Sequence, residues 1–526
     1  MTNSIEIWGK EIVTETISGI PYRIYKDRPR RIENLLAHAD GWGERAHIVQ
    51  GDRVLTFRGL HDAVAAKAAE LAALNLAPQS RVFLLGWNSP EWVVNFWAIL
   101  RAGAVPVLAN GWWSAEELAD ALRRLTPALT LADAAGLRKM PAGAATAPWE
   151  TPASPAPRNT RPEPIPDDEN APAVIIFTSG TEGRPKAVVL SHRSVLSGIH
   201  MILHITRRLP QQIGPDSGET ALHTGPLFHI GGVQTLLRAV MVADRLVMPA
   251  GKFDAGVAID LIATHRVARW SAVPTMVSRV LEHPDLAKRD LSSLKSLTVG
   301  GAPVHAELLT RIREGLPSVD ARVPTGYGLT ENGGQATAAS GGDTAARPGS
   351  SGRPLPCVEL RTLPPGDSAP DGEIQLRAPT QMLGFFDTAG SPIDGEGWLS
   401  TGDLGHLDAD GHLWITGRAK DMIIRGGENI APVAVESALM AIEGVNEVAV
   451  IGVPHPDLGE EVMAFVVLEA DLSAEDLARA LAGKVSSFAI PSRWHLQSDP
   501  LPTNHSGKID KAGLARDMRA RLAGAA

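Results

Sequence analysis

The sequence predicts an α/β protein: a large N-terminal domain of helix-covered parallel sheets with a small β-barrel-like subdomain, followed by a small C-terminal α+β domain. Three observations support this fold class. The chain of 526 residues is long enough for three or four folding units. Apolar runs alternate with amphipathic segments over residues 81–133, and several short strand-like runs follow near residues 350–420. Alternation at this spacing indicates parallel strands covered by helices on both faces.

The most regular pattern lies between residues 81 and 133, where the segments RVFLLGW, PEWVVNFWAILRAG, AVPVLA, SAEELADALRRL and ALTLAD follow one another. They predict strand, helix, strand, helix and strand. Ser114 and Glu117 have capping-box spacing at the start of the second helix, and Gly103 stands where the first helix should end. An amphipathic stripe over residues 60–76 predicts a further helix that packs beside them.

The remaining chain divides by composition. Residues 140–172 contain nine prolines and predict a surface connection, because proline is excluded from helix interiors and central strands. A second alternating segment follows over residues 173–347. The runs VELRTL, GEIQLRA and GHLWITG then predict a small antiparallel barrel or sheet, and the last hundred or so residues mix helix and strand patterns.

Charge and cysteine content exclude several classes of function. The net charge is −9 without a long basic run, so neither nucleic acid nor an anionic membrane is an expected partner. The lone Cys357 excludes an intramolecular disulfide framework and a cysteine zinc site. The N-terminus lacks a secretory apolar run, and the most apolar stretch, 92–109, is interrupted by Asn95, Arg101 and Pro106. We therefore expect a cytoplasmic protein without a membrane span, and leave homodimerisation open.

The strongest chemical signal is the segment APAVIIFTSGTEGRPKAVVLSH, in which a buried strand runs into a loop of glycines and hydroxyls. Glycines let backbone N–H groups approach a polyphosphate, hydroxyls donate further hydrogen bonds, and a lysine neutralises charge. A Gly-rich linker is the alternative interpretation. The loop does not match the P-loop pattern of NTPases. Its candidate phosphate-binding residues are Thr178, Ser179, Gly180, Thr181, Gly183 and Lys186.

Four further segments make this signal specific: PTGYGLTENGG at 324–334, STGDLG at 400–405, GRAKDMIIRGGENIAP at 417–432 and LPTNHSGKIDK at 501–511. With the phosphate loop, their order and spacing resemble the adenylate-forming superfamily of acyl-CoA synthetases, peptide-synthetase adenylation domains and luciferases, and are most similar to the acyl-CoA synthetases. The resemblance covers nearly the whole chain. It implies that a carboxylate attacks the α-phosphate of ATP to give an acyl-adenylate and pyrophosphate, and that the thiol of CoA then displaces AMP. ATP, Mg²⁺ and CoA are the implied cofactors.

The resemblance also implies roles for single residues around the nucleotide. Tyr327, followed by Gly328, resembles the aromatic residue whose ring stacks on the adenine. Thr330 resembles the residue that contacts the α-phosphate. Glu331 resembles the magnesium ligand, a hard oxygen of the kind that Mg²⁺ prefers. Asp403 resembles the acceptor for the ribose diol, supported by Arg418. The segment that lines the adenine and acyl pocket is matched by Gly300, Gly301, Ala302 and Pro303.

Other roles implied by the resemblance concern the C-terminal domain and its movement. Lys508 resembles the lysine that bridges the carboxylate and the α-phosphate during adenylation, where its charge would stabilise developing negative charge. Lys420 resembles the hinge between an adenylation domain at 1–419 and a mobile C-terminal domain at 420–526. Rotation about the hinge would present Gly426 and Gly427 to the pantetheine thiol. His229 resembles the gate between the acyl site and the pantetheine tunnel.

The sequence also departs from the family pattern at four positions. Glu182 stands in the phosphate loop where a neutral Thr or Ser is usual, and a carboxylate about 5 Å from a phosphate costs about 3 kcal/mol at an effective dielectric near 20. Ala187 replaces a usual Gly, Ala434 a usual Glu and Asn504 a usual Thr. We expect these departures to lower the efficiency of the adenylation step, not to change the fold.

The predicted acyl pocket contains no acidic residue placed to hold an α-amino group, so an amino acid is not the expected substrate. Its segments are rich in Gly, Val, Ala and Pro, which predicts an apolar acid: fatty, alicyclic or polycyclic. Two alternatives to a complete acyl-CoA synthetase are compatible with the sequence. One is a ligase specialised for thioester formation from a preformed acyl-adenylate, and the other is a catalytically silent acyl- or nucleotide-binding protein. The pocket segments are 229–234, 270–276, 299–303 and 326–334.

Overall fold

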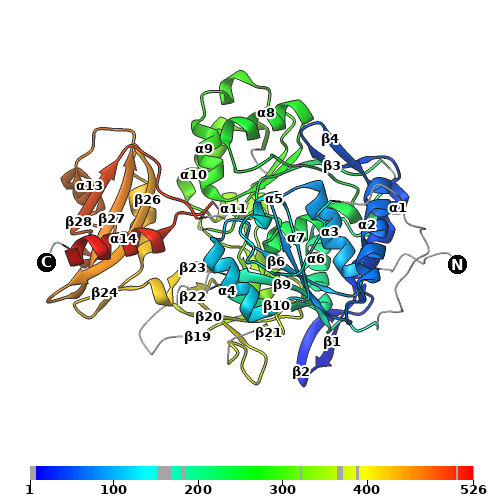
Figure 1. Cartoon of the computed structure of the whole chain (residues 1–526). Helices are drawn as coiled ribbons and strands as arrows, with labels where there is room; N and C mark the ends of the chain where they lie inside the picture. Colours follow the sequence, from blue (N-terminus) through cyan, green and yellow to red (C-terminus); the bar gives the residue numbers. More distant parts are fainter. Residues whose placement is uncertain are drawn as a thin grey trace.

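Two lobes of unequal size make up the structure, with the smaller C-terminal lobe at the left of Figure 1 in orange and red. The computed structural model describes residues 8–150, 167–178, 185–214, 216–302, 304–319, 323–363, 371–386, 390–504 and 507–524. The large lobe holds two mainly parallel sheets and an antiparallel sheet, and the small lobe holds one sheet with helices against it. The predicted fold class is therefore confirmed.

The first sheet has the strand order β21-β10-β9-β6-β5-β7-β8. All five elements expected between residues 81 and 133 are present, and the Ser114 capping box forms as predicted. The helix expected over 60–76 begins three residues earlier. Strands of this sheet are β5 (Arg81–Leu85), β6 (Val105–Ala109), β7 (Leu129–Ala132), β8 (Thr146–Ala147), β9 (Pro172–Thr178), β10 (Lys186–Ser191) and β21 (Gly384–Phe385). Helices around it are α2 (Phe57–Ala73), α3 (Pro90–Arg101), α4 (Ala115–Leu125), the short α5 (Ala134–Leu137) and α6 (His192–Ile205).

The second sheet has the order β14-β13-β11-β12-β3-β4 and is parallel except for the hairpin of β3 and β4. Its strands are β3 (Ala46–Gln50), β4 (Arg53–Thr56), β11 (Thr220–His223), β12 (Arg245–Val247), β13 (Arg269–Ala272) and β14 (Ser296–Val299). The helices that follow its strands are α7 (Ile230–Met241), α8 (Ala255–His265), α9 (Pro274–Glu282) and α10 (Ala306–Gly315). Parallel strands end at a common edge, where α/β sheets bind their ligands.

The antiparallel part of the large lobe is a four-stranded sheet, one of the two forms expected from its short strand-like runs. It consists of β19 (Glu359–Leu363), β20 (Gly372–Arg377), β22 (Leu399–Leu407) and β23 (Leu413–Arg418), in that order. Small hairpins precede it in the chain: β15 (Gly328–Leu329) with β16 (Gly334–Gln335), and β17 (Thr337–Ala338) with β18 (Arg353–Pro354). The N-terminal hairpin of β1 (Ile12–Ile17) and β2 (Ile20–Tyr25), α1 (Ala37–Trp42) and α11 (Gly341–Ala346) complete the lobe.

The small lobe begins after a 3-10 turn, Ala419–Asp421, which contains Lys420. Its strands are β24 (Ile423–Arg425), β25 (Glu428–Ile430), β26 (Val445–His455), β27 (Gly459–Leu468) and β28 (Arg493–Gln497), and its helices are α12 (Pro432–Met440), α13 (Ala474–Leu481) and α14 (Lys511–Gly524). The division of the chain at residue 420 stays a prediction. Over the described residues, none of the helices is both long enough and apolar enough to cross a membrane.

Candidate active site

The base of the predicted phosphate loop is formed by two strand ends. Thr178 ends β9 and Lys186 begins β10, and the antiparallel register places these two residues opposite each other. Both side chains are half-buried, and the Lys186 Nζ atom lies 5.1 Å from the centre of the Phe385 ring. The predicted site residues Ser179, Gly180, Thr181 and Gly183, as well as Glu182, lie outside the described residues. Those assignments stay predictions.

A tight turn brings Glu331 to the same place. The Thr178 hydroxyl donates a hydrogen bond to the Glu331 carboxylate over 3.4 Å. Thr330 and Glu331 begin a single 3-10 turn that closes at Gly333, whose φ of +60° lies in the left-handed region. The Gln234 amide of α7 donates to the Gly333 carbonyl over 3.0 Å. The turn is thus fixed from two sides, and Thr178, Lys186 and Glu331 share one corner of the large lobe.

Asp403 lies at the centre of a second group of predicted residues. Its side chain is only 6% exposed, and the Arg418 Nε atom donates to its Oδ1 over 2.5 Å. The Tyr327 hydroxyl donates to its Oδ2, also over 2.5 Å. Burial, and then the Asp403 charge, raise the pKa of Tyr327 well above its ordinary value. The pairing of Asp403 with Arg418 is as predicted, whereas the bond from Tyr327 has no signal in the sequence.

Glycine is needed beside Tyr327 because two backbone segments approach closely there. A Cβ atom on Gly328 would lie 2.4 Å from the Gly334 carbonyl oxygen of the paired strand. Such a contact is far below van der Waals distance and involves backbone that cannot move aside. Gly328 therefore holds the β15–β16 hairpin closed and sets the position of Tyr327 next to it.

Lys508 reaches this region from the other lobe. Its Cε and Nζ atoms lie 3.6 and 3.9 Å from the position that a Cβ atom on Gly301 would take. Figure 1 shows the red segment before α14 running from the small lobe toward the large one. Burial, and then the nearby Arg418 charge, lower the pKa of Lys508, while Asp403 acts in the opposite direction. Lys508, Asp403 and Arg418 are therefore close enough to interact electrostatically.

The segments expected to line the acyl pocket are only partly as predicted. Trp270 is fully buried and donates from its Nε1 atom to the Thr224 hydroxyl over 3.0 Å, so it belongs to the core and not to a pocket wall. Because side chains alternate along β13, the next residue, Ser271, is exposed. Gly301 is exposed and Ala302 half-exposed, whereas Pro303 lies outside the described residues. His229 precedes α7 and is half-buried, with its ring 4.7 Å from the ring of Phe228.

Three predicted residues do not join this group in the observed conformation. Gly426 and Gly427 form the exposed turn between β24 and β25, and the Gly426 amide bonds to the Leu458 carbonyl inside the small lobe. Lys420 is exposed in its turn between the lobes. The conformation therefore brings Lys508, and not the glycine turn, to the large lobe.

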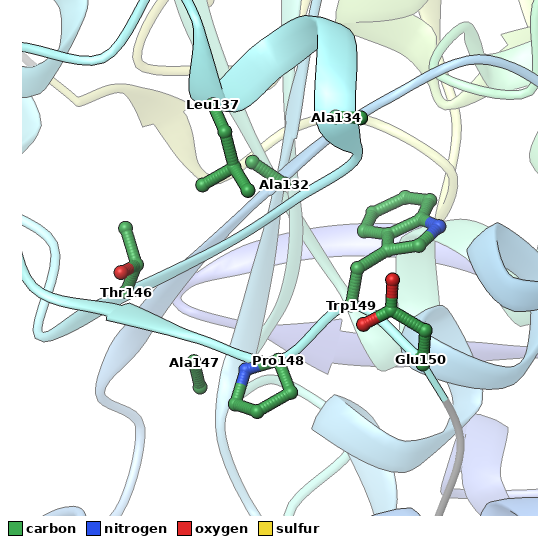
Figure 2. Close-up of a pocket in the computed structure, with 8 residues that line it drawn as sticks. All are labelled: Ala132, Ala134, Leu137, Thr146, Ala147, Pro148, Trp149 and Glu150. Atoms are coloured by element: carbon green, nitrogen blue, oxygen red, sulfur yellow. The ribbon is translucent and has the colours of Figure 1, made fainter.

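A cavity of about 340 Å³ lies elsewhere, at the end of β7 and beside α5 (Figure 2). Its lining is mainly apolar, with the Trp149 ring on one side and Glu150 near it. None of the predicted site residues contributes to it. Its lining consists of Ala132, Ala134, Leu137, Thr146, Ala147, Pro148, Trp149 and Glu150.

Comparison with known proteins agrees with this geometry. The model of the AMP-binding enzyme family matches residues 35–386, and that of the AMP-binding enzyme C-terminal domain matches residues 434–508. The chain belongs to the AMP-binding enzyme family. It is an adenylate-forming enzyme, most similar to the acyl-CoA synthetases.

Several named enzymes are similar to this chain over nearly their whole length. A methyl-dioxo-octahydroindenyl-propanoyl:CoA ligase of Rhodococcus jostii is 33% identical, over 91% of this chain and 96% of the relative. A feruloyl-CoA synthase of an Amycolatopsis species is 32% identical, over 89% and 94%. The o-succinylbenzoate CoA synthetase of Bacillus subtilis, solved with its acyl-adenylate, superposes with a TM-score of 0.77 at 28% identity, over 91% of this chain and 97% of that one.

Proposed function

We propose that this protein is an AMP-forming acyl-CoA synthetase, an acid-thiol ligase that activates an apolar carboxylic acid as its acyl-adenylate and transfers the acyl group to CoA. The observation that carries the proposal is the position of Lys508 beside Gly301 and within electrostatic reach of Asp403 and Arg418. A lysine delivered from the small lobe to this group suits a reaction that develops negative charge between a carboxylate and a phosphate.

The remaining residues fit the binding of ATP. A carboxylate offers about four acceptor positions. Tyr327 and Arg418 occupy one on each oxygen of Asp403, so acceptors remain for a ribose diol. Asp403 is held rigidly and needs no reorganisation when the nucleotide binds. Thr178 and Lys186 supply a donor and a positive charge at the start of the phosphate loop.

The donor set near Glu331 fits Mg²⁺. The carboxylate of Glu331 is a hard oxygen ligand, the Thr178 hydroxyl is bonded to it, and the remaining positions around Mg²⁺ are commonly taken by water and phosphate oxygens. Glu331 would hold the ion, and the ion would neutralise charge on the phosphates of ATP. Lys508 and the backbone near Gly301 would orient the acid and the α-phosphate.

The acid itself is proposed only as a class. Gly301, Ala302 and Ser271 offer small side chains at the carboxyl ends of β13 and β14, with no carboxylate to bind an amino group. The named relatives act on a bicyclic propanoate and on ferulate, and another is a fatty acid ligase for an acyl carrier protein. We infer an apolar acid with a sizeable hydrocarbon body. We further infer a cytoplasmic location.

Pyrophosphate release with a panel of fatty, alicyclic and aromatic acids, measured with and without CoA, tests the proposal. We expect ATP-dependent pyrophosphate release with at least one acid, and acyl-CoA only when CoA is present. Acyl-CoA formation only from a supplied acyl-adenylate would instead indicate a thioester-specialised ligase. Tight binding of ligand without either product would indicate a silent binding protein.

A further inference from the structure

Among the residues that the structure describes, two side-chain hydrogen bonds join the lobes in the observed conformation. The Thr275 hydroxyl of α9 donates to the carbonyl oxygen of Gly507, the residue directly before Lys508. The second bond links the His305 Nδ1 atom, before α10, with the Ser437 hydroxyl of α12 over 3.1 Å. Thr275 thus contacts the Lys508 loop itself, whereas His305 contacts the body of the small lobe.

The contact at Thr275 is closely fitted. Gly507 has a φ of +79°, and a Cβ atom on it would lie 3.0 Å from the Met276 Cε atom and 3.2 Å from the Val273 Cγ2 atom. The start of α9 therefore holds Gly507 by one hydrogen bond and by packing on either side of Thr275. Because Lys508 follows directly, fixing Gly507 restricts the directions that the lysine side chain can take.

Hydrogen bonds within the small lobe also link the two ends of the loop. The Asn504 side-chain oxygen accepts a hydrogen bond from the Lys508 backbone N–H over 3.1 Å. The Asn504 backbone N–H donates to the Lys508 carbonyl oxygen over 2.7 Å. Lys511, at the start of α14, pairs with the buried Glu436 over 2.5 Å. Asn504 and Lys508 are thus bonded to each other within the small lobe, and the Thr275 hydroxyl of the large lobe bonds to Gly507.

We propose that Thr275 is a positioning residue for the adenylation step, which holds Gly507 and thereby sets Lys508 at the reacting groups. The inference rests on the proposed function. The hydrogen bond exists only while the loop is docked, so it favours the docked conformation over any other. Attack of a thiol on a finished acyl-adenylate does not need a cation to bring two anions together, so Thr275 has no corresponding role in that step.

Separate assays of acyl-adenylate formation and of thioester formation distinguish this positioning role from a general structural role. Thr275→Val keeps the volume of the side chain and removes the hydroxyl, whereas Thr275→Ser keeps the hydroxyl. We expect Thr275→Val to lower kcat for pyrophosphate release about 3- to 10-fold, the loss expected for one hydrogen bond, with KM for the acid unchanged. Thr275→Ser should restore wild-type kcat, and Thr275→Val should lower thioester formation from supplied adenylate less than it lowers pyrophosphate release. Thr310→Val, which removes an exposed hydroxyl bonded to the Ala306 carbonyl within α10, is the matched control.

A second measurement does not depend on activity. Lys508 is half-buried in the docked loop, so its labelling by an amine reagent, followed by peptide mass analysis, reports docking. We expect faster labelling of Lys508 in Thr275→Val and in Thr275→Ala than in wild type, and unchanged labelling of the exposed Lys484. Unchanged Lys508 labelling, equal loss in both half-reactions, or a rise in KM for the acid alone would each overturn the proposal. Absence of pyrophosphate release in wild type, with faster Lys508 labelling in the variants, would refute the proposed function and leave the docking role of Thr275 supported.

Discussion

Asp403 shows how single residues couple the parts of this site. Its carboxylate is buried, accepts hydrogen bonds from Tyr327 and Arg418, and lies within electrostatic range of Lys508. A buried carboxylate is stable only when such donors compensate its desolvation. Changes at any of these partners should therefore alter nucleotide binding even where the changed side chain does not touch the nucleotide.

Tyr327→Phe should weaken the binding of ATP and of AMP by a similar factor of about 10. The variant keeps the ring but leaves one oxygen of the buried Asp403 without its donor, and a hydrogen bond to a charged group contributes about 1.5–3 kcal/mol. Both nucleotides carry the ribose, so both should be affected. Titration calorimetry measures this, with Tyr25→Phe, which removes a hydroxyl bonded to His204, as the control. Weakened binding of ATP alone would contradict the ribose role of Asp403.

Lys508→Ala should abolish acyl-adenylate formation and spare thioester formation from supplied adenylate. The reason is that its charge is needed where the carboxylate and the α-phosphate approach each other. Assays of the two half-reactions, with Lys484→Ala as an exposed lysine control, measure the difference. An equal loss in both would show that Lys508 serves another purpose.

The pH dependence of adenylation should report the same lysine. Burial and Arg418 lower the pKa of Lys508, so the required proton is lost at a lower pH than for an ordinary lysine. We expect kcat/KM for pyrophosphate release to fall as pH rises through that lowered pKa, because kcat/KM reports the free enzyme. A profile with no decline until the ordinary lysine pKa of about 10.4 is reached would argue against a Lys508 whose pKa is lowered by desolvation and by the Arg418 charge.

At the scale of elements, the helices and strands that the sequence predicted are those for which local signals agreed with tertiary burial. The β-α-β-α-β unit between residues 81 and 133 had caps, periodicity and length in accord, and all five elements formed. Trp270 was misplaced because alternation along β13 decides which side chain faces the core, and a short segment does not reveal its register. The bonds from Tyr327 to Asp403 and from Thr275 to Gly507 left no local signal, since they join residues 76 and 232 positions apart.

The turn between β23 and β24 is the element for which we predict a mechanical role. Lys420→Pro fixes φ near −65° and should restrict rotation of the small lobe after adenylation. We expect a normal first release of pyrophosphate and a fall of 10-fold or more in steady-state formation of acyl-CoA, on the order of the loss when a hinge no longer adjusts. Burst kinetics compare the two rates, with Lys420→Ala as the control. Steady-state turnover equal to that of Lys420→Ala would exclude a hinge at this position.

For the whole molecule, motif order and the family resemblance predicted the two lobes and the approach of Lys508, but not the contacts that dock the lobes. The bond from Thr275 to Gly507 and the bond between His305 and Ser437 join residues far apart in the sequence, and no local pattern encodes them. The large lobe also contains several buried histidines. Among the buried histidines of the described part of the large lobe, burial lowers the pKa of five to about 3 or 4: His38, His47, His192, His200 and His223.

These histidines should make the large lobe sensitive to acid. A histidine whose pKa is about 4 when folded and about 6.5 when unfolded binds a proton only in the unfolded state between those values, so the free energy of unfolding falls as pH falls through this window. Each histidine whose pKa is about 4 can contribute up to about 3 kcal/mol at 1.36 kcal/mol per pKa unit. Hydrogen exchange at pH 7, 6 and 5 should show protection lost in the large lobe before the small one, and His38→Gln should weaken this dependence by about one proton. Equal protection of both lobes at pH 5 and pH 7 would mean that these rings find partners for their protonated forms in the folded protein.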